Sequence, residues 1–340
     1  MAVITDATLT KIKNELHKQN EKLRDFVELY AASTWDTVQL NVKTGEAPGL
    51  YPVGTEMVCQ YTYNIVAYDF PWIVVAHRPV VWQDGTEHPG MILQSKFATF
   101  ESIQFDAPEQ IEATEETAQE GWYYCGRSGD TYTMLDLAVG ATIPYANYDH
   151  VYKGDVNHRD IYRYGYNRYL KSGQRQWLNS AACNGDWWES QHNGDCPPSQ
   201  LANYAGFMAG LDDDFLAVVN PIKVQVAANT VTDLGDTDIM YDLFFLPSVE
   251  EMYGLPQAAG VEGDYFPYWK TKTGLSNPDN SANAGRIITA IDNQSSAQTC
   301  RLRSASRGSA YIAWYVYATG TLSGGNANTS YRCAPACAIS

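Results

Sequence analysis

Apolar residues near the start of the chain recur every three or four positions. From Asp6 to Ala32 no Gly or Pro interrupts this spacing, which predicts a single amphipathic helix. The apolar positions form a heptad pattern with one polar member, Gln19; they are Leu9, Ile12, Leu16, Leu23, Phe26 and Tyr30. We therefore predict that residues 1–32 form a coiled-coil-like stalk that joins identical subunits into a homo-oligomer, with a trimer favoured. The alternative is an amphipathic helix that packs on its own domain.

The pattern changes after this helix. Residues 41–54, NVKTGEAPGLYPVG, are rich in Gly and Pro, which is typical of turns. We assign residues 33–49 to a linker and residues 50–340 to one folded domain.

Beyond Gly54 the apolar residues form short runs separated by turns, which predicts strands. The runs are TEMVCQYTY, YDFPWIVVA, PVVW, GMILQSKFATF, SIQFDA and VQVAANTVTD. Short helices are predicted at 172–180 and 207–220, and another helix starts at Ser248, where Ser248 and Glu251 have the spacing of a capping box. Few long helices, many short strands and 24 Tyr indicate an α+β fold whose long irregular loops are held by aromatic packing.

Charge and composition exclude several classes of function. The net charge of −16 argues against nucleic acid and anionic membranes as partners, because both require a basic surface. No apolar run approaches the roughly 20 residues of a membrane span, and the first residues lack a signal-peptide pattern. We therefore expect no membrane insertion, and synthesis in the cytoplasm without a signal peptide.

No catalytic residue, metal site or cofactor is predicted from the sequence, and we do not expect an enzyme. The seven Cys residues include no CxxC pair, which favours buried free thiols over a zinc site. Loop Asp and Asn residues lack EF-hand spacing, and no Ser-His-Asp set or pair of carboxylates is evident.

The last forty residues differ in composition from the rest of the acidic chain. From Ser304 to Ser340 there is no Lys, Asp, Glu, Gln, His or Met, and the only charged residues are Arg307 and Arg332. Tyr, Ser, Gly, Ala, Thr and Asn predominate there, as they do in antibody contact loops, where rigid Tyr rings combine with adaptable small polar groups. This composition predicts a surface that contacts a ligand.

Six ordered segments carry a resemblance to a known fold. They are YPVGTEM (51–57), FPWIVV (70–75), RQWLNS (175–180), FFLPSVEEMYG (244–254), RLRSAS (301–306) and YRCAPACAIS (331–340). With these segments the chain resembles the C-type-lectin-like fold in the form found in formylglycine-generating enzymes and DUF6273 proteins. The resemblance covers about residues 50–340.

The C-terminal segment is also similar to the variable region of proteins diversified by a retroelement, such as phage tropism determinants. In that system adenines of AAC and AAT codons are mutated, and such codons cannot become Lys, Glu, Gln or Met. The resemblance implies a hypervariable ligand-binding region at 301–340 whose partner is a bacterial cell-surface receptor, either protein or glycan. It also implies a location in the virion, at the phage tail, or on a bacterial surface.

This second resemblance divides the segment into framework and diversified positions. The implied framework is Leu302, Arg303, Ser304, Trp314, Val316, Gly320, Leu322 and Pro335. The implied ligand-binding residues are Ser306, Gly308, Ser309, Tyr311, Ile312, Tyr315, Tyr317, Thr319, Thr321, Ser323, Asn326, Asn328 and Tyr331, with Gly324, Gly325 and Thr329 also diversified. We predict that Tyr311, Tyr315 and Tyr317 are exposed and close together, so that replacing all three with Ala leaves the melting temperature nearly unchanged. Arg301 departs from the family pattern, which usually has Trp there.

Two alternatives remain. Formylglycine-generating enzymes bind copper through a C-terminal cysteine pair, and Cys333 and Cys337 have a similar place and spacing, so the chain could be a related oxidase. It could also be a structural virion protein that binds no receptor.

Overall fold

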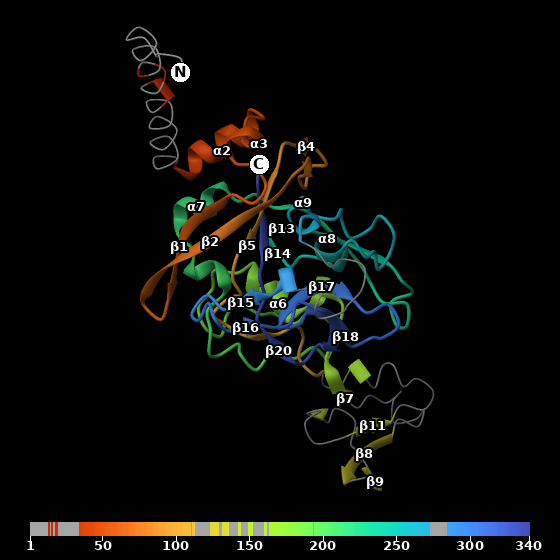
Figure 1. Ribbon diagram of the computed structural model, residues 1–340. Helices are drawn as coiled ribbons and strands as arrows, with labels where there is room; N and C mark the ends of the chain where they lie inside the picture. The colour runs from red at the N-terminus through yellow and green to blue at the C-terminus, as the bar shows by residue number, and fades with distance from the viewer. Residues whose placement is uncertain are drawn as a thin grey trace, which may run out of the picture.

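The computed structural model (Figure 1) describes residues 34–109, 160–161, 163–192, 194–272 and 284–340. It also describes four positions between 13 and 19, and the backbone of short strands between 111 and 151. The predicted helix from Asp6 to Ala32 thus lies largely outside the described residues, although Lys13, Glu15, Lys18 and Gln19 are helical and exposed. The stalk and the homo-oligomer stay predictions.

The centre of the molecule is a five-stranded antiparallel sheet in the order β1-β2-β5-β21-β14. Its strands are β1 (Glu56–Tyr63), β2 (Val66–His77), β5 (Met91–Ser95), β21 (Ala336–Ile339) and β14 (Phe244–Phe245). The last strand of the chain, β21, lies between β5 and β14. Because β21 lies inside the sheet, the C-terminal segment is fixed to the core at its end.

Aromatic side chains fill the core beside this sheet. Trp72 of β2 lies 5.2 Å from the ring of Phe215 and 6.0 Å from that of Phe244, and Phe207 lies 5.3 Å from Phe244. These rings come from β14, α7 (Asp213–Val218) and η3 (Phe207–Gly210), which are far apart from β2 in the sequence. Burial of such rings is a main source of stability in a domain of this size.

The segment predicted as a linker is part of the folded body, so that prediction was wrong. It forms α2 (Trp35–Lys43) and α3 (Ala47–Leu50), and Val38 and Val42 of α2 are buried in the core. Val38 and Val42 are four residues apart, so they lie on one helix face, and Trp35 contacts Phe215 at 4.7 Å. Gly45 lies in the turn between these helices, and Pro48 lies in the first turn of α3, where a proline is tolerated. Figure 1 places α2 and α3 beside the C-terminus.

Two further predictions had different outcomes. The capping box is confirmed: Ser248 caps α8 (Val249–Tyr253), and the Glu251 side chain accepts a hydrogen bond from the Ser248 backbone. The helix predicted at 207–220 is divided into η3 and α7, because Asp212 leaves the helical conformation and accepts a hydrogen bond from the Phe215 backbone at 2.7 Å.

The remaining elements are mostly short. Before residue 160 they are β3 (Val80–Val81), β4 (Glu87–His88), β6 (Ile103–Gln104), β7 (Ile111–Glu112), β8 (Tyr123–Ser128), β9 (Thr131–Leu135), β10 (Thr142–Ile143) and β11 (Asp149–Val151). Those that follow are η2 (Tyr169–Lys171), α6 (Gly173–Leu178), β12 (Ile222–Ala227), β13 (Thr237–Asp242), α9 (Pro267–Lys270), η4 (Ala284–Arg286), β15 (Ile288–Thr289), β16 (Ala297–Gln298), β17 (Cys300–Ala305), β18 (Ile312–Val316), β19 (Leu322–Asn326) and β20 (Ser330–Tyr331). Small antiparallel sheets with short helices make this an α+β structure. Within the described ranges, no helix has the length and apolar character needed to span a bilayer.

Candidate functional site

The C-terminal segment forms its own antiparallel sheet in the order β17-β18-β19. Arg301 of β17 lies opposite Tyr315 of β18, and Tyr315 lies opposite Ser323 of β19. Residues directly opposite one another in a sheet point to the same face. The three residues therefore form one row across the sheet, whereas Ile312 and Trp314 point to the other face.

The first strand of this sheet is anchored by buried polar groups. The Arg303 guanidinium contacts the Glu251 carboxylate at 2.5 Å and donates hydrogen bonds to the carbonyls of Leu246 and Glu262. The Ser304 hydroxyl donates to the Glu262 carboxylate at 2.5 Å. Burial alone would raise the pKa of Glu251, but Arg303 and then Arg78 reverse this effect and hold it below its usual value. The predicted framework residues Arg303 and Ser304 thus join β17 to α8.

Arg301 is fully buried, with carbonyl groups in place of a carboxylate partner. It donates four hydrogen bonds, at 2.9–3.2 Å, to the carbonyls of Ala313, Gly325, Asn326 and Thr329. Its guanidinium also lies 4.7 Å from the centre of the Tyr331 ring. Burial lowers the pKa of Arg301 to about 10, which still leaves it protonated at neutral pH. This arginine therefore joins β18, β19 and the following loop through their main chain.

Side chains from the rest of the domain also bind the main chain of this segment. The bonds run from the Asn167 amide to the carbonyls of Ser309 (2.6 Å) and Ile312 (2.8 Å), from the Tyr253 hydroxyl to that of Gly320 (2.8 Å), and from the Gln104 amide to that of Asn328 (2.8 Å). A carbonyl is present whatever side chain the residue carries. The path of the segment is therefore held largely independently of its side chains.

Most of the predicted ligand-binding residues reach solvent. Tyr317 is 47% exposed and Gly308 is also exposed. Those that are partly exposed are Ser306, Ser309, Tyr311, Ile312, Thr319, Ser323, Asn326, Asn328 and Tyr331. Tyr315 and Thr321 are only 9% and 8% exposed, so the predicted exposure of Tyr315 was wrong. Tyr315 is buried because its ring lies in the row that contains Arg301.

Of the three tyrosines predicted to lie together, the structure brings Tyr315 and Tyr317 together and places Tyr311 against a different residue. The ring of Tyr315 lies 6.2 Å from that of Tyr317 and 5.0 Å from that of Tyr331. Tyr311 lies instead against Tyr164, with 4.8 Å between ring centres. Tyr164 was not among the predicted site residues; the Tyr-rich sequence RYGYNRYL was the available signal for it. The site thus consists of one tyrosine group around Tyr331 and a second around Tyr164.

Two glycines restrict where this surface can vary. A Cβ atom added to Gly325 would lie 2.8 Å from the Tyr315 ring, and one added to Gly324 would lie 2.7 Å from Ile312. Contacts this short require the neighbouring side chain to move. Substitution at either glycine is therefore coupled to a diagonal neighbour on β18, Tyr315 for Gly325 and Ile312 for Gly324.

We expect Tyr315→Ala and Tyr317→Ala to differ in their effect on stability. Removing the buried Tyr315 ring leaves a cavity beside Arg301 and should lower the free energy of unfolding by about 2–3 kcal/mol. Removing the exposed Tyr317 ring should change it by less than about 0.5 kcal/mol. Denaturant unfolding of each variant measures this difference, and equal effects would show that the two rings share one environment. Because the triple replacement of Tyr311, Tyr315 and Tyr317 with Ala includes the buried Tyr315, we now expect it to lower the melting temperature.

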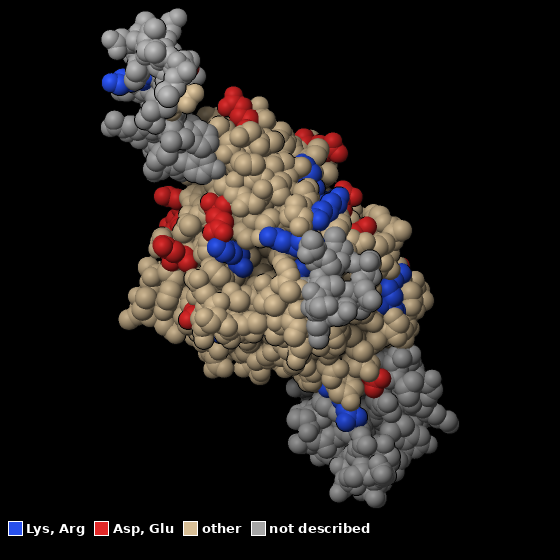
Figure 2. Space-filling view, in the orientation of Figure 1, with Lys and Arg blue, Asp and Glu red and all other residues tan. Residues whose placement is uncertain are grey.

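Charged side chains are unevenly distributed over the molecular surface. In Figure 2 they gather mainly over the upper part of the described body, whereas the lower part, where Figure 1 places β16 and β20, is drawn mostly in tan. This distribution agrees with the scarcity of charge in residues 304–340. A ligand that binds to this uncharged part of the surface would therefore have a low cost of desolvation, because few ionised groups lose bound water.

The cysteines relevant to the oxidase alternative are buried. Burial raises the pKa of the Cys333 thiol to about 12, and that of Cys337 is raised well above its ordinary value. A thiol binds copper or attacks as its thiolate, so burial disfavours the reactive form of both groups at neutral pH. Cys59 and Cys300 are buried as well, whereas Cys183 is exposed and Cys196 is intermediate.

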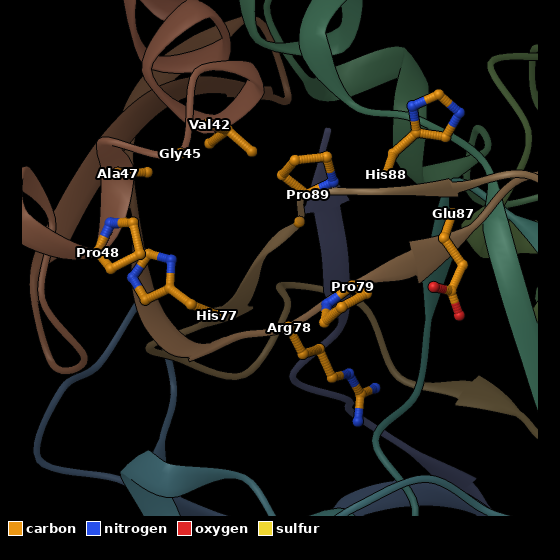
Figure 3. Close-up of a pocket in the computed structure, with 11 residues that line it drawn as sticks. Val42, Gly45, Ala47, Pro48, His77, Arg78, Pro79, Glu87, His88 and Pro89 are labelled. Atoms are coloured by element: carbon orange, nitrogen blue, oxygen red, sulfur yellow. The ribbon is translucent and has the colours of Figure 1, made fainter.

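A cavity of about 460 Å³ lies between α2–α3 and the loops around β3 and β4. Pro and Gly residues make up much of its lining (Figure 3). Its two histidines are already engaged: His77 bonds to the Tyr51 carbonyl at 2.8 Å, and His88 stacks on Trp82 at 3.7 Å. In Figure 3 the Arg78 side chain points away from the hollow, and it pairs with Glu251.

The fold and site define an α+β protein whose C-terminal sheet is held through its main chain and presents uncharged side chains. The chain belongs to the DUF6273 family, described as a domain of unknown function, because the sequence model of that family matches residues 146–340. No curated protein and no solved structure matches the chain. Within the described residues, no group of three or more His, Cys, Asp or Glu side chains is arranged to hold a metal ion.

Proposed function

We propose that this protein binds a receptor through a hypervariable C-terminal surface, as the tropism proteins of phages do. The contact residues are the exposed members of the segment, centred on Tyr317, Thr319 and Tyr331 near the β18–β19 turn. Tyr315 and Thr321 support this surface from below. We further propose that the domain has a C-type-lectin-like fold, which agrees with the insertion of β21 into the central sheet.

The main-chain anchoring of the segment is the observation that carries this proposal. Arg301, Asn167, Tyr253 and Gln104 all donate hydrogen bonds to carbonyl groups of residues 309–329. A surface that accepts random substitutions needs a backbone whose conformation does not depend on those side chains. Exposed positions without buried contacts usually change stability by less than about 0.5 kcal/mol when substituted.

The side chains present on this surface suit molecular recognition. Tyr provides a large contact area at low cost in conformational entropy, and Ser, Thr and Asn provide adaptable hydrogen bonds. Such side chains dominate affinity when they lie at the centre of a contact. If the predicted stalk joins several copies of the domain, binding of several copies to one surface at the same time would raise the avidity by about 10²-fold or more. This supports a role at a phage tail or a bacterial surface.

A cysteine oxidase is the second candidate function, and the burial of its two cysteine thiols disfavours it. Cys333 and Cys337 are fully buried with raised pKa values. Copper-dependent oxidation of a thiol peptide by the purified protein, lost on Cys333→Ser, would restore this candidate. A purely structural virion role is distinguished from receptor binding by the next experiment.

We expect the purified full chain to bind a subset of bacterial surfaces in a panel of strains. On a positive strain, Tyr317→Ala should weaken binding at least about tenfold, because an exposed central Tyr is a typical hot spot. Tyr241→Ala, at a partly exposed tyrosine of β13 outside the segment, is the matched control and should leave binding unchanged. A second variant carries both Asn326→Ala and Asn328→Ala. If this variant and Tyr317→Ala both bind as strongly as the wild type, the proposal is contradicted. If the wild type binds to no bacterial surface, the structural role is favoured.

The DNA beside the gene gives an independent test of diversification. We expect a near-copy of the codons for residues 301–340 that differs only at adenines, together with a reverse-transcriptase gene. Sequencing of the flanking region checks this. A flanking region with neither feature would leave the binding surface but remove the retroelement from the proposal.

A further inference from the structure

A second, smaller cavity of about 190 Å³ opens beside the end of β1. It is lined by residues of the β1–β2 hairpin, by Glu101 and by two loop segments around 184 and 203–210. Its described lining residues all lie outside the segment 301–340, so it is separate from the proposed receptor-binding surface. Its volume is several times the roughly 30 Å³ that one water molecule occupies in the liquid.

Glu101 is the unusual feature of this cavity. Its side chain is only 5% exposed, and one carboxylate oxygen, Oε1, accepts a hydrogen bond from the Tyr61 hydroxyl at 3.3 Å. The other oxygen, Oε2, is buried and has no hydrogen-bond partner within the part of the chain that the structure describes. A buried carboxylate with an oxygen that lacks a donor is costly, so a carboxylate of this kind at the wall of a cavity marks a place where a cationic donor would be stabilised.

Tyrosines and asparagines line the cavity together with this carboxylate. Tyr61, Tyr63 and Tyr204 contribute aromatic side chains, and Asn184 and Asn203 contribute amides near its opening. The Tyr63 ring is fixed by stacking on Phe100, with 4.4 Å between centres and 10° between planes. Aromatic rings combined with a single carboxylate are the usual surroundings of an organic cation, which gains from both cation–π attraction and the negative charge.

The neighbouring charges leave Glu101 available to a ligand. The cationic group whose charge acts on Glu101 is Arg332, which already makes two hydrogen bonds to Asp292, at 2.6 and 3.2 Å. A divalent metal ion would need several oxygen ligands, often more than one carboxylate, and Glu101 is the only carboxylate among the described lining residues. An anion would be repelled by Glu101. A small singly charged organic cation therefore fits the cavity best.

We propose that this cavity binds a primary ammonium group, with the carboxylate of Glu101 as its counter-charge and the tyrosine rings surrounding it. The group could belong to an amino sugar or to a lysine side chain, which share this chemistry. The small volume admits the ammonium group and a few attached carbons, so the cavity recognises one functional group of a larger molecule. This site does not depend on the receptor-binding function proposed above.

Binding should depend on pH in a defined direction. Burial raises the pKa of Glu101 to about 7 in the free protein, so the carboxyl is largely protonated below that pH. A cation binds the ionised form, and the affinity should therefore rise with pH up to about 7 and then level off. The other titratable or charged groups near it are Tyr61, Tyr63, Cys333, Arg332 and Asp292. Burial raises the pKa of Tyr61 and of Cys333 far above this range, so neither should titrate with Glu101.

Calorimetric titration of the full chain with two matched pairs of probes tests the proposal. The first pair is Nα-acetyl-lysine amide and its Nε-acetylated form, and the second is glucosamine and N-acetylglucosamine. Saturable binding of either amine, weakened at least tenfold by its acetylation, supports the proposal and identifies the source of the ammonium group. The lysine probe stays charged across the pH range because its pKa is about 10.4.

Two variants complete the test. Glu101→Gln keeps the shape of the side chain and should weaken amine binding about 10–100-fold, the loss expected for a hydrogen bond between charged groups, and should remove the pH dependence. If that variant fails to fold, Asn203→Arg places a like charge at the exposed rim and should also weaken binding, whereas Asn203→Gln should not. Absence of amine binding, equal binding of the acetylated probes, or an affinity unchanged by these variants would overturn the proposal.

Discussion

Arg303→Met should lower the free energy of unfolding by about 3–5 kcal/mol at neutral pH, because it leaves the Glu251 carboxylate buried without its closest partner. The substitution also removes the donors from the carbonyls of Leu246 and Glu262. Arg78 still contacts Glu251 at 3.0 Å, so the loss should fall short of complete unfolding. Denaturant unfolding of the variant and the wild type measures the difference.

The pH dependence of this loss provides a further check. In the wild type, Arg303 and Arg78 offset the effect of burial and keep the folded pKa of Glu251 below its unfolded value. That contribution is present above the unfolded pKa and is lost as the pH falls through the folded pKa. In Arg303→Met, burial should raise the folded pKa, so protonation at acidic pH stabilises the variant. The stability difference should therefore shrink as the pH falls from 7 to about 4.

Arg332→Met is the matched control for this prediction. Arg332 belongs to the same C-terminal segment but pairs with Asp292, whose side chain is 45% exposed. Surface ion pairs contribute about 0–1 kcal/mol, so this substitution should have little effect. A loss for Arg303→Met no larger than that for Arg332→Met would contradict the assignment of Arg303 as the anchor of β17.

Arg301→Met should lower the free energy of unfolding by at least about 3 kcal/mol, because each buried acceptor that loses its donor costs about 1–3 kcal/mol. Four carbonyls from β18, β19 and the following loop lose their donors together. The β18–β19 hairpin should open more often as a result. Hydrogen exchange at the amides of residues 312–326, alongside denaturant unfolding, measures both effects.

Arg301→Lys separates the charge of this residue from its shape. Lys carries the same charge, but its single ammonium group cannot reach four carbonyls in the planar arrangement of a guanidinium. We expect this variant to lose most of the stability that Arg301→Met loses. Wild-type stability of Arg301→Lys would show that the charge alone is sufficient, and wild-type stability of Arg301→Met would refute main-chain anchoring by this residue.

These two arginines explain how a variable surface could coexist with a stable domain. Arg303 fixes β17 to α8 through Glu251, and Arg301 then fixes β18 and β19 to β17 through carbonyl groups. Neither arginine contacts the exposed side chain of Tyr317. Substitutions at Tyr317 should therefore change what the surface binds without changing how the sheet is held.

Local features of the fold could be predicted from the sequence where they depend on neighbouring residues. The capping box of Ser248 and Glu251 and the buried strand around Trp72 follow from spacing and composition alone. The linker prediction failed because Gly45 and Pro48 were weighted more than the apolar spacing of Val38 and Val42. Burial of those valines in the core decides that the segment is a helix of the domain.

The site was predictable only in part, for a different reason. The uncharged composition of residues 304–340 predicts a contact surface, and most of the predicted contact positions reach solvent, whereas residues 333–340 are buried. Burial of Tyr315 depends on the register that places it opposite Arg301, and the contact of Tyr311 with Tyr164 joins residues far apart in the sequence. Single-sequence patterns report on near neighbours and not on such pairs.

The sequence by itself determined the α+β class, the capped helix at Ser248 and the scarcity of charge from Ser304 to Ser340. Only the tertiary structure decided that α2 belongs to the core, that Tyr315 is buried while Tyr317 is exposed, and that the Glu101 carboxylate lines a cavity together with tyrosines. Propensity, capping and composition act over a few residues, whereas burial and the pKa of an ionisable group depend on which distant segments pack around it.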